Sequence, residues 1–478
     1  MPFVKTSVLL LTLTLARWAW SQPANGTFPV DIFSPQSLPQ LTVLVNTNPS
    51  NGDMYLCGVD MNGRYLAITD KNGIVQKAIQ KKQPQMDADF RPNPNGTYSY
   101  FSGAANAFII LDTNFLAMDT VVAPIGYQID YREIRFTSEG DRLIIANDTQ
   151  IIDMRKYIAG GDSAAAVVVP SIFKLDKNNT VLWSWHSLDH FKVTDATQEL
   201  LTASFIDFCH MNAIEFDADS NLLISSRNMD EITKIDSKTG NIIWRWGGKN
   251  NQFLLVSDSI PFSHQHAIRR TPQGTYTMFD NGNFGSLSPH SRAIEYRLDT
   301  VSHTATKIWE FRHNPDILAI AMGYVERLPN KNTLIGWGQN MNIAVTEVDQ
   351  ANNTVFEMAM APGSYSYRAY KFDTNYIRSG LQQESVRSQS AGTIALKVVP
   401  NPMTDVAKIE WDVPVEGFTG LYLYDGLGRE VSKIYSGYLS PGMHECTVNS
   451  QNLAAGIYYL KPLFPGLQGS GIKIMILK

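Results

Sequence analysis

The sequence predicts an all-β protein in which a six-bladed β-propeller is followed by a small C-terminal β-sandwich. Three observations predict it. A sequence motif recurs through the middle of the chain, apolar residues alternate with the period of two typical of strands with almost no helical period, and the sequence pattern changes after a polar stretch at residues 381–397. A pair of sandwiches is the competing architecture for the middle, and the regularity of the repeat argues against it.

The first 21 residues, 1–21, predict a secretory signal peptide. Lys5 supplies the positive charge, residues 8–16 (VLLLTLTLA) are the apolar centre, and small residues precede a cut ahead of Gln22. The apolar run is short for a membrane span, and no other segment is long enough. We therefore expect no integral membrane span, and a protein that is secreted or attached to the cell surface.

Residues 22–380 predict the propeller. From about Gly52 to about Asp373, an apolar run that closes in aspartate is followed by a polar turn and a second apolar run. Because a closed ring of such hairpins leaves a central channel, we expect the functional site at one of its mouths. About six copies occur at spacings of roughly 40 to 65 residues, near the period of a four-stranded blade, and their closing aspartates are Asp70, Asp112, Asp176, Asp236, Asp299 and Asp349.

Composition narrows the classes of function. The formal net charge is −5 with no long basic run, which argues against a nucleic-acid partner. Cys57, Cys209 and Cys446 form neither a disulfide framework nor a metal-binding pattern, and no acidic cluster has the spacing of a calcium loop. We therefore expect no metal and no cofactor. A thiol nucleophile at Cys209 is a minor alternative to simple burial of that side chain.

The candidate site lies within residues 207–283, where polar side chains stand at the ends of short apolar runs. His210 and Asn212 occupy alternate positions and so face one side of a strand, while Arg227 and His266 follow at two further strand ends. Arginine and asparagine donate hydrogen bonds to oxyanion oxygens, and a neutral imidazole can attack or move a proton. Together they predict a site for a tetrahedral anion, although a lone histidine at a strand end is more often a structural hydrogen-bonder.

Other polar groups in the middle of the chain are expected to be less central. His264 alternates with His266 and would share its face, so we expect it in a supporting or surface position. Three further histidines are expected to be solvated turn residues, His290, His303 and His313. The segment 247–249 (GGK) lacks the spacing and the following Ser or Thr of a phosphate loop, which argues against a nucleotide donor.

Residues 381–397 predict a polar linker, and residues 398–478 predict the C-terminal sandwich. This end carries several ordered motifs: 400–402 (PNP), 424–430 (YDGLGRE), 453–459 (LAAGIYY) and 473–476 (KIMI). With these motifs it resembles the type IX secretion (Por) sorting domain of Bacteroidetes. The resemblance implies the type IX secretion machinery as a partner and a domain without chemistry of its own. A carbohydrate-binding or adhesion sandwich is the alternative.

The middle of the chain also carries motifs in a fixed order, which are His210-x-Asn212 and the segments 225–227 (SSR), 235–244 (IDSKTGNIIW), 247–248 (GG), 265–266 (QH), 279–282 (FDNG) and 328–335 (LPNKNTLI). With them it resembles the bacterial arylsulfate sulfotransferase family. The resemblance implies a six-bladed propeller that moves a sulfuryl group from an aryl sulfate donor to a phenolic acceptor without the nucleotide donor PAPS. It further implies that His266 is transiently sulfated, while His210, Asn212 and Arg227 hold the sulfuryl oxygens.

One position departs from the family's pattern. Arg132 stands where the family has a further active-site histidine, in the phrase at residues 130–136 (DYREIRF). Arginine can bind a sulfuryl group but cannot act as an acid or base near neutral pH, so we expect Arg132 to contact substrate while proton transfer to the leaving phenolate is weakened. A non-catalytic propeller that binds anionic or glycan ligands is the second hypothesis, and a structural surface protein is the third.

Overall fold

The computed structural model divides the chain into two compact units, Met1–Ile377 and Arg378–Lys478. The predicted signal peptide and almost all of the predicted linker lie outside the described residues, so the predicted domain boundaries stay predictions. The structure describes residues 40–60, 63–81, 86–284, 288–340, 342–372, 396–413, 417–425, 430–439, 442–451, 453–463 and 472–478.

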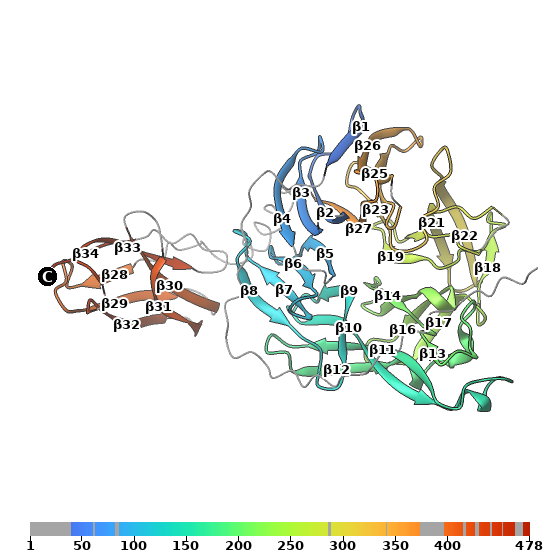
Figure 1. Ribbon diagram of the computed structural model, residues 1–478, viewed down its shortest axis with the longest axis horizontal. Coiled ribbons are helices and arrows are strands. Elements are labelled where there is room, and N and C mark those ends of the chain that lie inside the picture. Colours follow the sequence, from blue (N-terminus) through green and yellow to red (C-terminus); the bar gives the residue numbers. More distant parts are fainter. Residues whose placement is uncertain are drawn as a thin grey trace, which may run out of the picture. The chain divides into compact units, whose positions relative to one another are not determined.

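The described part of the first unit forms six sheets around a common centre (Figure 1). In chain order of their inner strands, three of them contain β5 (Asp87–Pro92), β6 (Tyr98–Ser102), β7 (Ala107–Leu111) and β8 (Ala117–Val121); β9 (Gln128–Phe136), β10 (Arg142–Ile152), β11 (Ala165–Leu175), β12 (Val181–His186) and β13 (Phe205–Ile206); and β14 (Met211–Phe216), β15 (Leu222–Ser226), β16 (Glu231–Ile235) and β17 (Ile242–Gly247). The other three contain β18 (Leu254–Val256), β19 (His266–Arg270), β20 (Tyr276–Asp280), β21 (Arg292–Asp299) and β22 (Thr304–Phe311); β23 (Tyr324–Arg327), β24 (Thr333–Gly336), β25 (Ile343–Val348), β26 (Thr354–Met360) and β1 (Leu41–Asn46); and β27 (Tyr365–Phe372), β2 (Asp53–Asp60), β3 (Gly63–Thr69) and β4 (Val75–Lys81).

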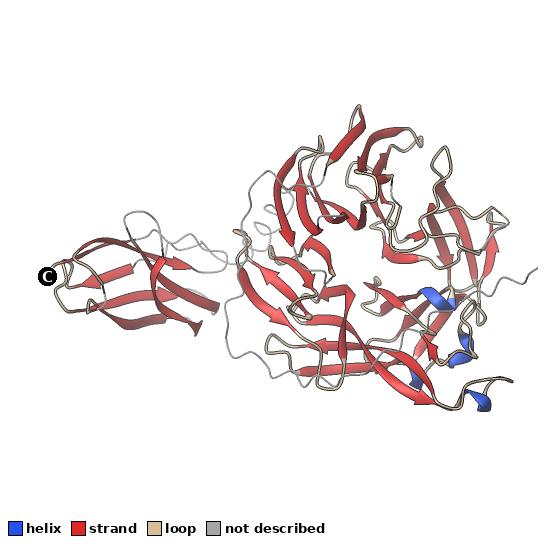
Figure 2. Cartoon of the chain, viewed as in Figure 1, coloured by secondary structure: helices blue, strands red, loops and turns tan. Residues whose placement is uncertain are grey.

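Strands dominate this unit, and the helices in the described residues are single turns (Figure 2). Pairing within the sheets is antiparallel except for the short strands β13 and β18, which pair in parallel at sheet edges. The short helices are η2 (Met154–Lys156), η3 (Ser187–Asp189), η4 (Val193–Asp195) and η5 (Arg227–Met229). None of the helices within the described ranges has the length and apolar character that crossing a bilayer requires.

The first and last described strands of the first unit are tied into the ring by hydrogen bonds. β27 pairs with β2, with Asp53 opposite Phe372, and β1 pairs with β26, with Leu41 opposite Met360. The innermost strands touch one another in a complete cycle, β5 to β9, β14, β19, β23, β27 and back to β5. The ring is thus closed by contacts between sheets, which confirms the predicted all-β, propeller-like fold.

The repeat read from the sequence is a capped turn. Asp70 accepts backbone N–H groups from Asn72 and Ile74, both at 2.9 Å. The same pair of contacts, from residues two and three or four positions ahead, recurs at the other five closing aspartates, which are Asp112, Asp176, Asp236, Asp299 and Asp349. A short carboxylate that satisfies two turn amides fixes the hairpin between the outer strands.

The second unit is a small sandwich of two sheets, as predicted. Its core contains Trp411, Leu423 and Leu460. The amide of Asn401, in the Pro-Asn-Pro motif, donates to Lys473 O and accepts from Met475 N, which ties this motif to the last strand. The sheets consist of β28 (Leu396–Val399), β29 (Val406–Val413) and β32 (Gly442–Asn449), and of β31 (Glu430–Leu439), β30 (Gly417–Tyr424), β33 (Gly456–Leu463) and β34 (Ile472–Ile476).

Candidate active site

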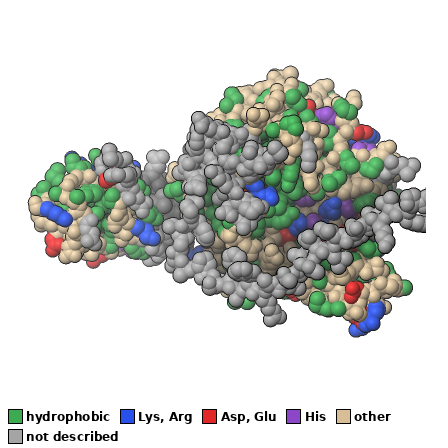
Figure 3. Space-filling view, in the orientation of Figure 1, with side chains coloured by type: hydrophobic (Ala, Val, Ile, Leu, Met, Phe, Trp, Pro, Cys, Tyr) green, Lys and Arg blue, Asp and Glu red, His purple; other side chains and the backbone are tan. Residues whose placement is uncertain are grey.

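The structure brings the five predicted site residues together near the starts of inner strands. Arg132 lies in β9, His210 directly precedes β14, Asn212 lies in β14, His266 opens β19, and Arg227 begins η5 after β15. The Arg227 backbone N–H donates to the His210 carbonyl at 3.1 Å. On the face drawn in Figure 3, histidine side chains lie beside Lys or Arg side chains toward the middle of the ring.

His266 is held in one tautomer. Its Nδ1 lies 2.8 Å from the carbonyl oxygen of Gly323. A carbonyl can only accept, so Nδ1 carries the proton and Nε2 keeps its lone pair. The side chain is 3% exposed, and among the described residues Nε2 has no hydrogen-bond partner. Burial, followed by the charge of Arg368, lowers the pKa of His266 well below its ordinary value, so the imidazole is neutral.

Asn212 clamps the backbone on both sides of His266. Its Nδ2 donates to Gln265 O at 2.8 Å, and its Oδ1 accepts from Ala267 N at 3.3 Å. The side chain is fully buried, and the backbone carbonyl oxygen of Asn212 accepts from Arg368 Nη2 at 2.7 Å. These contacts fit a residue that positions the imidazole of His266, and they leave the amide little capacity to hold sulfuryl oxygens directly.

Both ring nitrogens of His210 are engaged. Nδ1 lies 2.5 Å from Asp207 Oδ2, and Nε2 lies 2.9 Å from Arg132 Nη2. Because a guanidinium only donates, Nε2 is the acceptor and Nδ1 donates to Asp207. Burial and then Arg132 lower the pKa of His210, against the opposing effect of Asp207. Arg132 is itself paired with Asp130, so these residues form one chain of hydrogen bonds.

His264 is buried, so of the two expected positions, supporting or surface, the surface position is excluded. It is 4% exposed, its backbone N–H donates to Asp230 Oδ1 at 2.6 Å, and its Nδ1 lies 3.0 Å from Asn283 Nδ2. Burial, followed by the charges of Arg227 and His210, lowers the pKa of His264 to about 3. Its alternation with His266 was the signal that placed it on the same face.

Backbone strain gathers at these histidines. His210, His264 and Ala267 have φ values of 49°, 54° and 58°. Residues other than glycine rarely adopt this left-handed region, and such positions persist where the surroundings hold them. The strained positions flank or contain the candidate site, which is consistent with a site built for function.

Behind the histidines lies a buried ion network on the ring axis. Glu133 of β9 is fully buried and contacts Arg91 of β5 at 3.1 Å, Arg269 of β19 at 2.7 Å and Arg368 of β27 at 3.2 Å. Burial alone would raise the pKa of Glu133, but Arg269, Arg368 and Arg91 lower it to about 2. The network joins four inner strands, and Arg368 continues from it to the Asn212 carbonyl.

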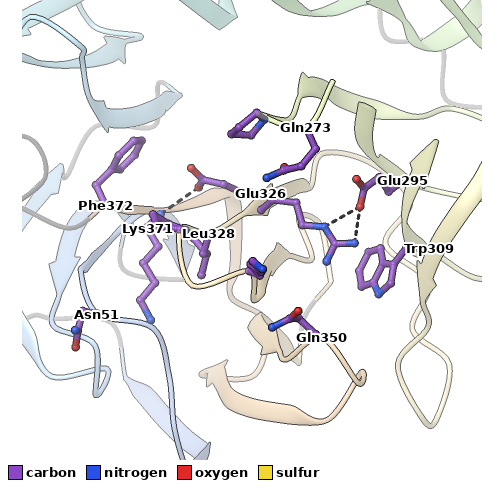
Figure 4. A pocket seen from close by; sticks show the side chains of 13 residues that line it. Asn51, Gln273, Glu295, Trp309, Glu326, Leu328, Gln350, Lys371 and Phe372 are labelled. Atoms are coloured by element: carbon purple, nitrogen blue, oxygen red, sulfur yellow. Dashed lines mark hydrogen bonds and ion pairs between the residues drawn. The ribbon is translucent and has the colours of Figure 1, made fainter. Parts of the chain in front are cut away.

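A pocket of about 780 Å³ opens where the inner strands end, away from the histidines that stand at their starts (Figure 4). Arg327 is paired there with Glu295, and burial raises the pKa of Glu326 to about 7. Its lining includes neither a histidine nor a cysteine. Across the residues with described positions, no cluster of three potential metal ligands occurs.

A family model described as Arylsulfotransferase (ASST) matches residues 42–370, which is most of the chain and includes every residue of the candidate site. The chain belongs to the arylsulfotransferase family. The resemblance predicted from the motifs is thereby confirmed. The arylsulfotransferase unit is followed by a second match, residues 397–463, to a secretion system C-terminal sorting domain, which confirms the resemblance of the C-terminal unit.

Similar individual proteins are more distant. The arylsulfate sulfotransferase AssT of Lelliottia amnigena is 26% identical over 170 residues, and the match covers 29% of this chain and 28% of that protein. The arylsulfotransferase unit described here therefore matches little more than a quarter of that relative. A solved protein of unknown function from Bacteroides caccae shares 11% identity (TM-score 0.42; 66% of this chain, 99% of that chain), and virginiamycin B lyase from Staphylococcus aureus shares 13% (TM-score 0.35; 66% and 87%). Neither likeness bears on function.

Proposed function

We propose that this arylsulfotransferase transfers a sulfuryl group from an aryl sulfate ester to a phenolic acceptor, without PAPS, through a sulfo-histidine at His266. The observation that carries the proposal is the fixed tautomer of His266, whose Nδ1–H is given to Gly323 and whose Nε2 lone pair is left free. The depressed pKa keeps that lone pair available at neutral pH. A preformed neutral nucleophile is what attack on a sulfate ester needs.

The reaction divides into two displacements at sulfur. In the first, the Nε2 lone pair forms an N–S bond while the bond from sulfur to the aryl oxygen breaks, and the donor leaves as a phenolate. In the second, the acceptor phenol loses its proton to solvent, its oxygen attacks sulfur, and the N–S bond breaks to restore the imidazole. Arg132 and Arg227 are the cationic groups beside the histidines that would stabilise charge on the sulfuryl oxygens.

His210 is given a supporting role in this scheme. Its Nε2 already accepts from Arg132 and its Nδ1–H is directed to Asp207, so it has no free nitrogen with which to protonate a leaving phenolate. Through this contact it orients the Arg132 guanidinium. The donor phenol therefore leaves as an unprotonated phenolate. We expect this step to be easiest for donors whose phenols are acidic.

The location of the protein is also a proposal. The C-terminal sorting domain supports export by the type IX secretion machinery, with the predicted N-terminal signal peptide serving the first membrane crossing. We infer a secreted or surface-attached arylsulfotransferase that meets its aryl sulfates outside the cell.

The activity is tested by mixing the protein without its signal peptide with a chromogenic aryl sulfate and a phenol acceptor. We expect release of the donor phenol and formation of one equivalent of sulfated acceptor by mass spectrometry, with no requirement for PAPS. Binding of the aryl sulfate without any release of phenol would instead favour the second hypothesis, a binding protein, for which the Arg132–His210 pairing is the supporting observation.

The pH dependence follows from the state of His266. Protonation removes the attacking lone pair, and because the pKa of His266 is lowered, the active form persists below the ordinary histidine range. We expect kcat/KM for the aryl sulfate to change by less than about twofold between roughly pH 7.5 and 5.5, whereas a histidine titrating near 6.5 would lose about tenfold. A profile with an inflection near that value would contradict the assignment.

Asn212→Ala tests positioning against direct binding. Removing the amide frees the backbone on both sides of His266, so we expect kcat to fall by on the order of 10²-fold with little change in KM. Steady-state kinetics on a variant whose circular dichroism matches that of the parent measures this. A rise in KM at unchanged kcat would show instead that Asn212 binds the sulfuryl group itself.

A further inference from the structure

His264 is locked into the opposite tautomer from His266. Asn283 Nδ2 donates to Ile320 O at 2.9 Å, which fixes the orientation of this amide because a flipped amide would set two oxygens against each other. The same Nδ2 lies 3.0 Å from His264 Nδ1, so Nδ1 is an acceptor. The neutral imidazole of His264 therefore carries its proton on Nε2.

The Nε2–H group of His264 is buried without a hydrogen-bond partner among the described residues, and the Nε–H of Arg227 is in the same condition. The two side chains are neighbours, because Arg227 Nη2 and Asn283 Nδ2 share the carbonyl of Ile320, at 3.1 Å and 2.9 Å. Buried donors in native proteins are nearly always satisfied. Two unsatisfied donors on neighbouring side chains indicate an acceptor that binds from outside.

We propose that His264 is a further substrate-binding residue, whose Nε2–H donates, together with the Nε–H of Arg227, to oxygen atoms of the bound sulfuryl group. The inference rests on the proposed sulfuryl transfer and adds to it a residue for which the family resemblance gave no counterpart. The sulfuryl group of an aryl sulfate is an anion with oxygen acceptors, which matches one cationic and one neutral donor.

The three histidines then have separate tasks, each fixed by a neighbour. Gly323 leaves His266 with a free lone pair, Arg132 and Asp207 occupy both nitrogens of His210, and Asn283 leaves His264 with a free N–H. A neutral imidazole placed in a dry site can donate to a growing negative charge without giving up its proton, and fixed donors of this kind contribute strongly to catalysis.

The test compares His264→Phe, which keeps a ring and removes the donor, with His264→Gln, which retains an N–H. Each is made in the active protein and in the His266→Ala background, where 4-nitrophenyl sulfate binding is measured by calorimetry without turnover. The matched control is His303→Phe, because His303 is exposed and also left-handed, with a φ of 51°. If His264→Phe does not fold, His264→Asn replaces it, since asparagine tolerates this backbone and its amide is too short to reach.

We expect His264→Phe to weaken 4-nitrophenyl sulfate binding by at least about tenfold and to lower kcat/KM by on the order of 10²-fold, with His264→Gln recovering part of both. The control should match the parent. The inference would be overturned if His264→Phe bound 4-nitrophenyl sulfate as tightly as the parent, or if the Phe and Gln variants lost binding and kcat/KM equally. Neither result would affect the proposal that transfer depends on His266. Absence of both binding and transfer in the parent would reject the proposed function and this inference together.

Discussion

Replacing His266 by alanine is expected to abolish sulfuryl transfer, lowering kcat by on the order of 10⁴- to 10⁶-fold, as loss of a covalent nucleophile does in other enzymes. The reason is that Nε2 of His266 is the free imidazole lone pair in the cluster, because Nε2 of His210 accepts from Arg132 and that of His264 carries a proton. Release of 4-nitrophenol from its sulfate ester in the presence of a phenol acceptor measures the effect.

The fold of the His266→Ala variant is expected to survive, because the clamp formed by Asn212 holds backbone atoms and not the imidazole. Binding of aryl sulfate should persist in this variant. Adding free imidazole provides a further check, since a small nucleophile that occupies the vacated space should restore a fraction of donor cleavage. Parental turnover in His266→Ala would exclude this residue as the nucleophile.

The second large effect is expected on stability, from Glu133→Gln. The carboxylate of Glu133 is the shared partner of Arg91, Arg269 and Arg368, and all four side chains are buried. Removing one partner of a buried ion network leaves uncompensated charge, which costs about 3–5 kcal/mol. Denaturant unfolding should therefore show a free energy of unfolding that is lower by that amount. Transfer activity should also fall, because Arg368 donates to the backbone carbonyl of Asn212.

Glu139→Gln is the matched control for this effect. Glu139 lies six positions later, in the exposed turn between β9 and β10, and its side chain accepts a hydrogen bond from the neighbouring Ser138. We expect its unfolding free energy to stay within about 0.5 kcal/mol of the parent. Equal unfolding curves for the two variants would show that the axial network adds no net stability.

Much of the fold was predictable from local chemistry. The closing aspartates, Asp236 among them, repeat because each caps the same kind of turn. A local turn motif that recurs along the chain was therefore enough to predict a ring of similar hairpins. The placement of the candidate residues was predictable in outline, because His210, Asn212 and His266 stand where inner strands begin and the ring brings those ends together.

Other features of the site depend on partners far away in the chain. Arg368 reaches Asn212 from β27, across 156 positions, and no local pattern near either residue signals this contact. Asn212 was expected to hold substrate, yet its amide is used on the backbone around His266. The tautomer of His266 likewise follows from a distant partner, the carbonyl of Gly323, which lies 57 positions later in the chain.

The central claim is tested most directly by trapping the intermediate. The protein is mixed with an aryl sulfate carrying radioactive sulfur, without acceptor, quenched at alkaline pH to preserve an N–S bond, digested and mapped by mass spectrometry. We predict one sulfuryl group on the peptide that contains His264 and His266, located on His266 by fragmentation and discharged when a phenol is added before the quench. A label on another residue, or donor cleavage in acceptor-free single turnover that leaves no label on the protein, would contradict this account.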